Sequence, residues 1–205
     1  MGSATTDVID KRLLRGARTR KLVLKRAVDI ASLDGLEGVS FGRLAADTGL
    51  SKAGIQTLFK TKETLQLAAV DYAREIFVDN VVQPARSAPR GVARLRALLD
   101  QWVVYVSTPV CEGGCFRAAN LAAFDSRTGP VHDALFRDQR AWLDVLSGEL
   151  RYAVDIGEIA DLDVELATFQ IDALLCAANT ALRTGDDTAV DKVRRIISGL
   201  LVVRP

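Results

Sequence analysis

Apolar residues recur at helical spacing along almost the whole of this 205-residue chain. Val23, Ala27, Ile30 and Ala31, for example, fall on one side of a helix. Four of the five prolines lie between the periodic segments, where proline is tolerated, and the fifth is the last residue. No stretch shows the alternating pattern of a half-buried strand. We therefore predict an all-α protein.

Glycines, prolines and capping residues divide this periodicity into about nine helices. The expected spans are 19–34, 40–48, 51–59, 61–82, 92–106, 115–125, 130–155, 163–183 and 188–203. A chain of this length contains one or two domains and can bury a substantial core.

Basic residues concentrate in the first third of the chain. The net charge is only +1, but residues 1–62 carry 12 Lys and Arg against 6 Asp and Glu, whereas residues 63–205 carry 15 against 20. Eight of the basic residues lie between Lys11 and Arg26. This segment favours a polyanionic partner, although a charge run by itself is also typical of a solvated helix face.

The stretch 40–59, SFGRLAADTGLSKAGIQTLF, has the pattern of two short helices joined by a tight turn. Ser40 and Ser51 suit N-caps, and Gly49 suits a turn that needs a positive φ. The apolar residues that would hold the two helices at a steep angle are Leu44, Ala45, Leu50 and Ile55. This is a helix-turn-helix pattern, whose second helix enters the major groove of DNA. Such corners also occur in ordinary bundles, but here Lys60 and Lys62 follow at once.

The segment from about Thr19 to Ala73 resembles the TetR/AcrR family of transcriptional repressors. The resemblance rests on the spacing of Asp34-Gly35, Gly38-Val39-Ser40, Leu44-Ala45, Gly49-Leu50-Ser51, Lys52, Leu58-Phe59 and Lys62-Glu63-x-Leu65. It implies a homodimer joined by the last two long helices, an effector pocket in the C-terminal domain, and release of DNA when that pocket fills. The segment 113–136 also resembles a C-terminal subtype of these regulators. We accordingly expect a basic, flexible arm over 1–18, a helix-turn-helix domain with its connecting helix over 19–82, and an effector-binding and dimerisation domain over 83–205.

The recognition helix departs from the family pattern. Where relatives commonly carry a threonine and aromatic residues, this chain has Gly54, Gln56, Thr57 and Leu58. We expect Gln56 and Thr57 to reach bases by hydrogen bonds. The residues expected to read bases, all on the exposed side of this helix, are Lys52, Ala53, Gln56 and Thr57. The expected phosphate contacts, from positive charge and a helix N-terminus, are Arg18, Arg20, Ser40, Arg43 and Lys62. For each residue the alternative is a surface position that contributes nothing to binding.

The expected effector contacts are large or polar residues on helices that should surround a cavity. They are Trp102, Tyr105, Phe116, Asn120, Phe124, Trp142 and Phe169. Asn120 is the hardest of these to ascribe to packing, because a buried amide needs hydrogen-bond partners. The competing interpretation is an ordinary core that contains aromatic residues.

The sequence shows no sign of an enzyme. It has no phosphate-binding loop, no dinucleotide fingerprint and no paired Cys/His spacing, so we predict no catalytic activity, no cofactor and no metal. Cys111, Cys115 and Cys176 are expected to be free thiols in a reducing compartment. The single histidine, His132, is expected to be exposed or to cap a helix. No apolar run approaches the ~20 residues that span a bilayer, and the N-terminus carries no export signal, so we expect a cytoplasmic protein without a membrane partner.

These patterns together predict a ligand-responsive repressor that binds a palindromic operator in double-stranded DNA as a dimer and is released by a small-molecule effector. One alternative is a helical ligand-binding or protein-interaction module whose helix pair does not read DNA. A steep loss of duplex binding with salt would distinguish the repressor from this module. Another is a thiol-based redox regulator in which Cys111 and Cys115 pair on oxidation.

Overall fold

The computed structural model describes residues 3–108, 110–160 and 162–201, with side chains from Leu14 onward. All elements of regular secondary structure within these residues are helices, which confirms the all-α prediction. The helices are α1 (Ser3–Asp34), α2 (Phe41–Thr48), α3 (Lys52–Phe59), α4 (Lys62–Phe77), α5 (Gln83–Ala85), α6 (Val92–Ser107), α7 (Phe116–Phe124), α8 (Pro130–Asp155), α9 (Val164–Arg183) and α10 (Ala189–Leu200), with a 3-10 turn η1 (Leu36–Gly38) and a π-helical turn η2 (Val78–Val82).

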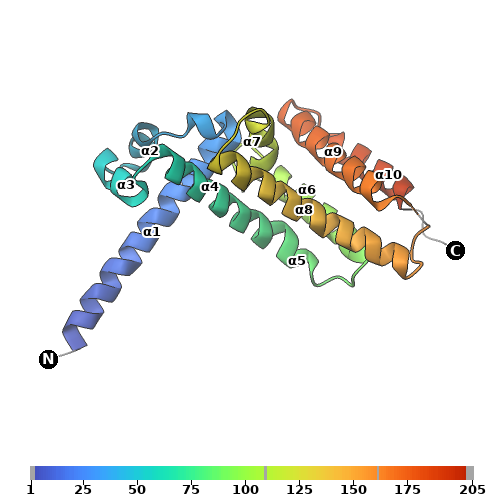
Figure 1. Cartoon of the computed structure of the whole chain (residues 1–205), viewed down its shortest axis with the longest axis horizontal. Helices are drawn as coiled ribbons and strands as arrows, with labels where there is room; N and C mark the ends of the chain where they lie inside the picture. The colour runs from blue at the N-terminus through green and yellow to red at the C-terminus, as the bar shows by residue number, and fades with distance from the viewer. Residues whose placement is uncertain (1–2, 109, 161, 202–205) are drawn as a thin grey trace.

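The first helix is longer than its periodicity suggested. It begins at Ser3, so the basic segment from that residue on is helical where a flexible arm was expected. Its C-terminal half packs into the core, with the predicted stripe of Val23, Ala27, Ile30 and Ala31 fully buried. Its N-terminal half projects away from the rest of the molecule (Figure 1). The side chains of residues 1–13, including Lys11 and Arg12, lie outside the described part of the structure.

The capping residues place α2 and α3 as the sequence predicts. Each of Ser40 and Ser51 accepts a backbone N–H three residues further on, at 3.2 and 3.1 Å. Gly49 ends α2 in the left-handed conformation at φ 70°. Leu44 and Ile55 are fully buried where the two helices meet. The turn and the caps therefore hold α3 in a defined direction against α2.

The helical segment formed by α4, η2 and α5 connects the two halves of the molecule. It runs without a break from residue 62 to 85, and corresponds to the single helix expected over 61–82. Phe77 near its middle packs edge-on against Tyr105 of α6 and Trp142 of α8, with ring centres 5.4 and 5.0 Å apart. The helix-turn-helix domain and the C-terminal domain thus share one continuous core.

The C-terminal half is a stack of antiparallel helices, in which α9 and α10 lie on the side of α8 away from α4 (Figure 1). Their inner faces are buried through residues such as Ile171, Leu175 and Val193. α10 ends at Leu200, and residues 202–205, which contain the expected helix end, are outside the described residues. None of the helices described is both long and apolar enough to cross a membrane.

Candidate functional site

The four predicted base-reading residues share the solvent-exposed side of α3. Lys52, Ala53, Gln56 and Thr57 are all exposed, while the opposite side of the helix is buried. The Thr57 hydroxyl donates to the Ala53 carbonyl at 2.9 Å, which leaves its oxygen lone pairs and its methyl group available. The Gln56 amide makes no hydrogen bond within the described part of the chain, so its donor and its acceptor are both free to meet a base edge.

Arg43 and Lys62 each pair with a carboxylate beside this surface. Arg43 Nη1 lies 2.6 Å from Asp34 Oδ2, and Lys62 Nζ lies 3.1 Å from Glu37 Oε2. The Lys62 hydrogen bond, together with one from Arg127, lowers the pKa of Glu37, so this carboxylate stays ionised. All these groups are substantially exposed, and exposed ion pairs cost little to open. A DNA phosphate can therefore replace either carboxylate as the partner.

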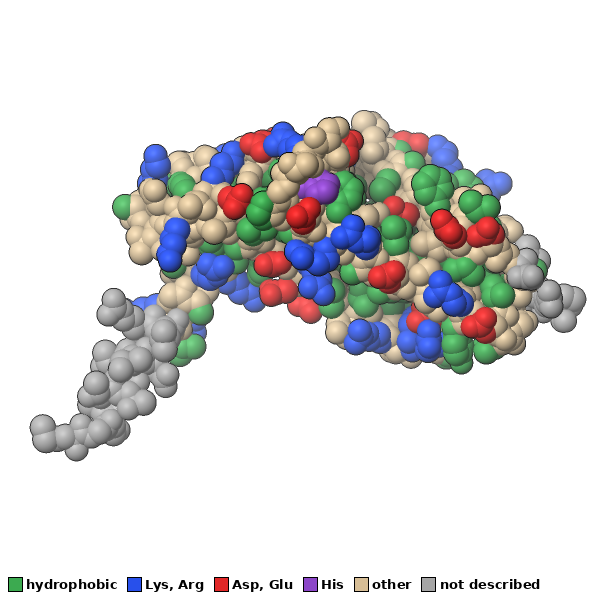
Figure 2. Space-filling model, viewed as in Figure 1, with side chains coloured by type: hydrophobic (Ala, Val, Ile, Leu, Met, Phe, Trp, Pro, Cys, Tyr) green, Lys and Arg blue, Asp and Glu red, His purple; other side chains and the backbone are tan. Residues whose placement is uncertain are grey.

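The other predicted phosphate contacts differ in how firmly they are held. Arg20 lies over the Phe59 ring, 4.5 Å from its centre, which keeps the guanidinium next to α3. Arg18 is exposed, and Ser40 presents the N-terminus of α2. Lys60, not selected from the sequence, is exposed at the end of α3 with φ 61°. Figure 2 shows Lys and Arg side chains around the end of the molecule that α2 and α3 form.

Two of the seven predicted effector contacts, Trp102 and Trp142, line a cavity between α6, α7, α8 and α9. Its volume is about 10 Å³, which is room for one water molecule. Three further aromatic residues, Tyr105, Phe116 and Phe124, are buried in the core without forming this wall. A ligand larger than water therefore requires the cavity to open.

The polar part of the cavity wall consists of residues that sequence reasoning missed. Arg117 Nε donates to Asp138 Oδ2 at 3.0 Å, and its guanidinium lies 4.4 Å from the centre of the Phe77 ring. Asp172 accepts a hydrogen bond from Gln139 Nε2 at 2.7 Å, and burial raises the pKa of this carboxyl. Gln139 Oε1 is buried without a hydrogen-bond partner among the described residues. The sequence signal that could have identified these residues was a charged side chain, Arg117 or Asp172, on an otherwise apolar helix face.

Asn120 has a different role from the one predicted. Its side chain is fully buried, and its Oδ1 accepts the backbone N–H of Leu36 at 2.7 Å. Its Nδ2 donates to the carbonyls of Ala31 at 3.1 Å and Phe116 at 2.7 Å. Because backbone groups already occupy both donors and the acceptor, Asn120 joins α7 to the end of α1 and does not line the cavity.

The prediction that Phe169 lines the cavity is wrong. Its side chain is 71% exposed on α9. The helix carries two apolar stripes, and only the one that contains Ile171 and Leu175 faces the core. Leu166 shares the exposed stripe with Phe169, and Ile196 of α10 is also exposed. Figure 2 shows hydrophobic side chains at the surface over this part of the molecule.

The three cysteines are in environments that disfavour the thiolate. Burial raises the pKa of Cys111 and Cys115, and it raises the pKa of Cys176 to about 11. The thiolate is the reactive form, so all three thiols are poorly suited to oxidation at neutral pH. This observation weighs against the redox alternative.

Comparison with known proteins agrees with this architecture. Residues 91–197 match the family described as "Tetracyclin repressor-like, C-terminal domain". A TetR transcriptional regulator from Chloroflexus aurantiacus J-10-FL superposes with a TM-score of 0.81 at 25% identity, over 93% of this chain and 98% of that one. A TetR-family regulator from Streptomyces coelicolor gives 0.77 at 23% identity, over 91% and 95%. AibR, solved in complex with isovaleryl coenzyme A and operator DNA, gives 0.70 at 20% identity, over 89% and 97%. No curated protein matches the chain.

A helix-turn-helix joined to a helical C-terminal domain is the architecture of a transcriptional regulator. The family match covers just over half of the chain, and the chain belongs to the TetR family of transcriptional regulators. The match at 91–197 lies outside the segment 19–73 that carried the main resemblance in the sequence, and it contains the segment 113–136 that resembles a C-terminal subtype. The two halves of the chain therefore indicate the same family independently.

Proposed function

We propose that this regulator is a homodimeric repressor that binds a palindromic operator and is released by a small-molecule effector. The observation that carries the proposal is the exposed side of α3, where Lys52, Ala53, Gln56 and Thr57 lie together beside the basic residues. A helix of this kind, held by capped neighbours, fits the major groove, in which every base pair presents a distinct pattern of donors and acceptors.

The exposed apolar residues of α9 and α10 support a dimer through these helices. Leu166, Phe169 and Ile196 are each more than half exposed, at 60%, 71% and 52%. Isolated exposed leucines are common, but apolar side chains gathered on two adjacent helices favour a buried interface. A symmetric dimer of this kind carries two copies of α3, which can reach successive major grooves about 34 Å apart.

The wall of this narrow cavity supports an effector site. Two tryptophans give it an apolar surface, and Arg117, Gln139 and Asp172 supply oriented polar groups, a combination typical of small-molecule sites. AibR, which has the same fold, was solved with both a small ligand and operator DNA. We propose that this chain also binds a small molecule, and that opening of the cavity favours a conformation that no longer fits the operator.

Selection of duplexes from a genomic pool at near-physiological salt tests the proposal. We expect enrichment of a palindrome whose half-sites are about one helical turn apart, and an affinity that falls with salt by a log–log slope of about −0.9 per phosphate contacted. Mass spectrometry would show whether the preparation carries a bound small molecule. If a folded dimer without one enriched no duplex, the result would favour the helical interaction module instead.

A further inference from the structure

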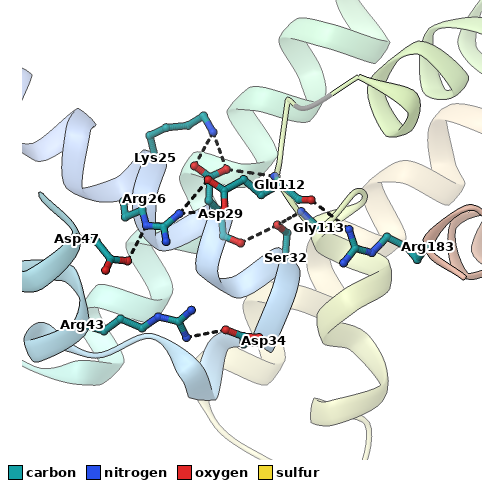
Figure 3. Close-up of polar contacts among 10 residues, drawn as sticks. All are labelled: Lys25, Arg26, Asp29, Ser32, Asp34, Arg43, Asp47, Glu112, Gly113 and Arg183. Carbon is teal, nitrogen blue, oxygen red and sulfur yellow. Dashed lines mark hydrogen bonds and ion pairs between the residues drawn. The ribbon is translucent and has the colours of Figure 1, made fainter.

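The loop formed by residues 111–114 lies directly on the C-terminal half of α1 (Figure 3). The Gly113 N–H donates to Ser32 Oγ at 2.8 Å, and Ser32 Oγ donates in turn to the Asp29 carbonyl at 2.8 Å. A Cβ at position 113 would overlap the backbone carbonyl of Ser32, so only glycine allows this approach. The loop between α6 and α7 is thus fitted to the surface of a helix in the DNA-binding half.

Glu112 contacts two other helices through three different groups. Its carboxylate accepts two hydrogen bonds from Arg26 Nη1 of α1, at 2.9 and 3.0 Å. Its backbone carbonyl accepts a hydrogen bond from Arg183 Nη1 of α9 at 3.1 Å, and its backbone N–H points to Asp29 Oδ1 at 3.4 Å. One residue of the C-terminal domain therefore joins α9 to α1 (Figure 3).

Arg26 continues the connection to the helix-turn-helix. Its Nε donates to Asp47 Oδ2 at 2.7 Å, and Asp47 lies in the last turn of α2. The hydrogen bond that Arg26 donates to Asp47 raises the pKa of Arg26. Burial opposes this rise, and the hydrogen bond that Arg26 donates to Glu112 adds to it. A single guanidinium is therefore shared between the C-terminal domain and the first helix of the DNA-binding pair. Charge-assisted bonds of this kind are directional, although the exposure of the Glu112 carboxylate makes their contribution to stability modest.

The other end of the loop is attached to the cavity. Cys115 lines the cavity wall, and its backbone N–H donates to Asn179 Oδ1 of α9 at 2.9 Å. α9 also supplies Asp172 and Cys176 to the same wall. α9 therefore contacts this segment twice, through Arg183 at the Glu112 carbonyl and through Asn179 at the Cys115 N–H. A change in the position of α9 or of the start of α7 would move the 111–114 loop.

We propose that Glu112 is a positioning residue that connects the state of the cavity to the orientation of α2 and α3 through Arg26 and Asp47. This inference rests on the proposed function, because it concerns how DNA binding and the cavity affect each other. With the cavity as narrow as it is in this structure, Glu112 holds Arg26 and Asp47 in place. Opening of the cavity withdraws Glu112 and lowers the population of the orientation that binds DNA.

The two tryptophans provide a direct readout of this coupling. Trp102 and Trp142 are the only tryptophans in the chain, and both line the cavity. Coupling between two sites is reciprocal, so DNA bound at α3 must change the surroundings of these residues. Titration with the selected duplex is therefore expected to change the intrinsic tryptophan fluorescence of the wild-type protein. A fluorescence signal that stays constant up to saturation would overturn the proposal.

Glu112→Gln removes the charge and keeps the shape of the side chain. We expect about three- to tenfold weaker binding of the duplex and loss of most of the fluorescence change, since two such contacts act in each dimer. Glu75→Gln is the matched control, because Glu75 is exposed on α4 and makes no ion pair among the described residues. It should behave as wild type. A Glu112→Gln protein with the full fluorescence change, even if less heat-stable, would show a merely structural role.

Hydrogen exchange without DNA separates this inference from the proposed function, since it needs no duplex. In Glu112→Gln and in Gly113→Ala we expect faster amide exchange in α2 as well as in the 111–114 loop. Faster exchange confined to the loop, with α2 at the wild-type rate, would overturn the positioning role whether or not an operator is found. Glu112→Gln alone decides the matter if Gly113→Ala does not fold.

Discussion

At the scale of single residues, Gln56 on the exposed side of α3 and Lys62 at the start of α4 differ in what they can recognise on DNA. The Gln56 amide is free within the described contacts, whereas the Thr57 hydroxyl already donates to the helix backbone. Lys62 is tied to Glu37 at the N-terminus of α4. An amide can form a bidentate pair with adenine, but an ammonium beside a helix N-terminus recognises only phosphate charge.

Gln56→Ala should relax the preference for one base position and leave the others unchanged. The expected loss of discrimination is about 1–3 kcal/mol, the usual value of a bidentate contact. Competition between the operator and single-base variants measures it, with the exposed Gln83→Ala as a control that keeps the wild-type preference. Equal weakening on every duplex would show that Gln56 does not read a base.

Lys62→Ala should weaken binding to all duplexes alike and reduce the salt slope by about 1, because one phosphate contact is lost. Affinity measured across a salt series checks this expectation. Lys192→Ala is the control, since Lys192 also pairs with a carboxylate, at 2.7 Å from Asp186, but lies on α10. A loss for Lys62→Ala that depends on the base sequence would contradict the assignment.

Asp172 should make stability depend on pH. Burial raises the pKa of its carboxyl, although the Gln139 hydrogen bond and the Arg117 charge oppose this. The native state therefore holds the proton more tightly than the unfolded state, and stability falls as pH rises through the native pKa. In urea unfolding, Asp172→Asn should be more stable than wild type at neutral pH and equal to it in acid. Asp144→Asn is the control, because Asp144 is exposed. If the gain in stability of Asp172→Asn persisted in acid, the raised pKa of Asp172 would not be its cause.

At the scale of elements, α3 depends on its cap. Its eight residues form too short a helix to be stable alone, so the Ser51 N-cap and the packing of Ile55 maintain it. Ser51→Ala should cost about 0.5–2 kcal/mol and speed amide exchange in α3. Ser147→Ala, in the interior of α8, should stay within about 0.5 kcal/mol of wild type. Unchanged exchange in α3 would show that packing alone holds this helix.

The length of a helix was predicted well where one of its faces is buried. It was predicted poorly where no face is buried, as over residues 14–18 of α1. The apolar stripe of α1 from residue 23 on could be recognised in the sequence, because burial of one face imposes a 3.6-residue period. The preceding turns have exposed side chains such as Leu14 and Leu22, so no periodic stripe marks them. The helix continues to Ser3 all the same, because no proline interrupts it and residues 11–18 are mainly Lys, Arg, Leu and Ala, which favour helix.

At the scale of the whole molecule, the exposed stripe of α9 should determine the oligomeric state. Phe169→Glu places a charge on this surface, so we expect the mass in solution to fall from that of a dimer to that of a monomer, with loss of operator affinity. Light scattering measures the mass. Leu22→Glu is the control, because Leu22 is a similarly exposed residue on α1, at 53%. A Phe169→Glu dimer would place the interface elsewhere.

The two regions of the candidate site were not equally predictable. The four predicted base-reading positions follow from the 3.6-residue period of one short helix, and all four side chains are exposed as expected. The cavity depends on which sides of four helices meet, and a sequence period leaves that open. Phe169 was therefore placed on the wrong side of α9, and Arg117 and Gln139 were missed.

The amino-acid sequence by itself was enough to establish the helical class, the buried stripes and the capped helix pair, because periodicity, capping and turn conformation act between residues a few positions apart. Contacts between distant segments came only from the folded chain. Arg26 meets Glu112 across 86 positions, and Asn120 binds the backbone of Leu36 across 84. Such contacts depend on how whole helices pack, and a local pattern carries no record of that packing.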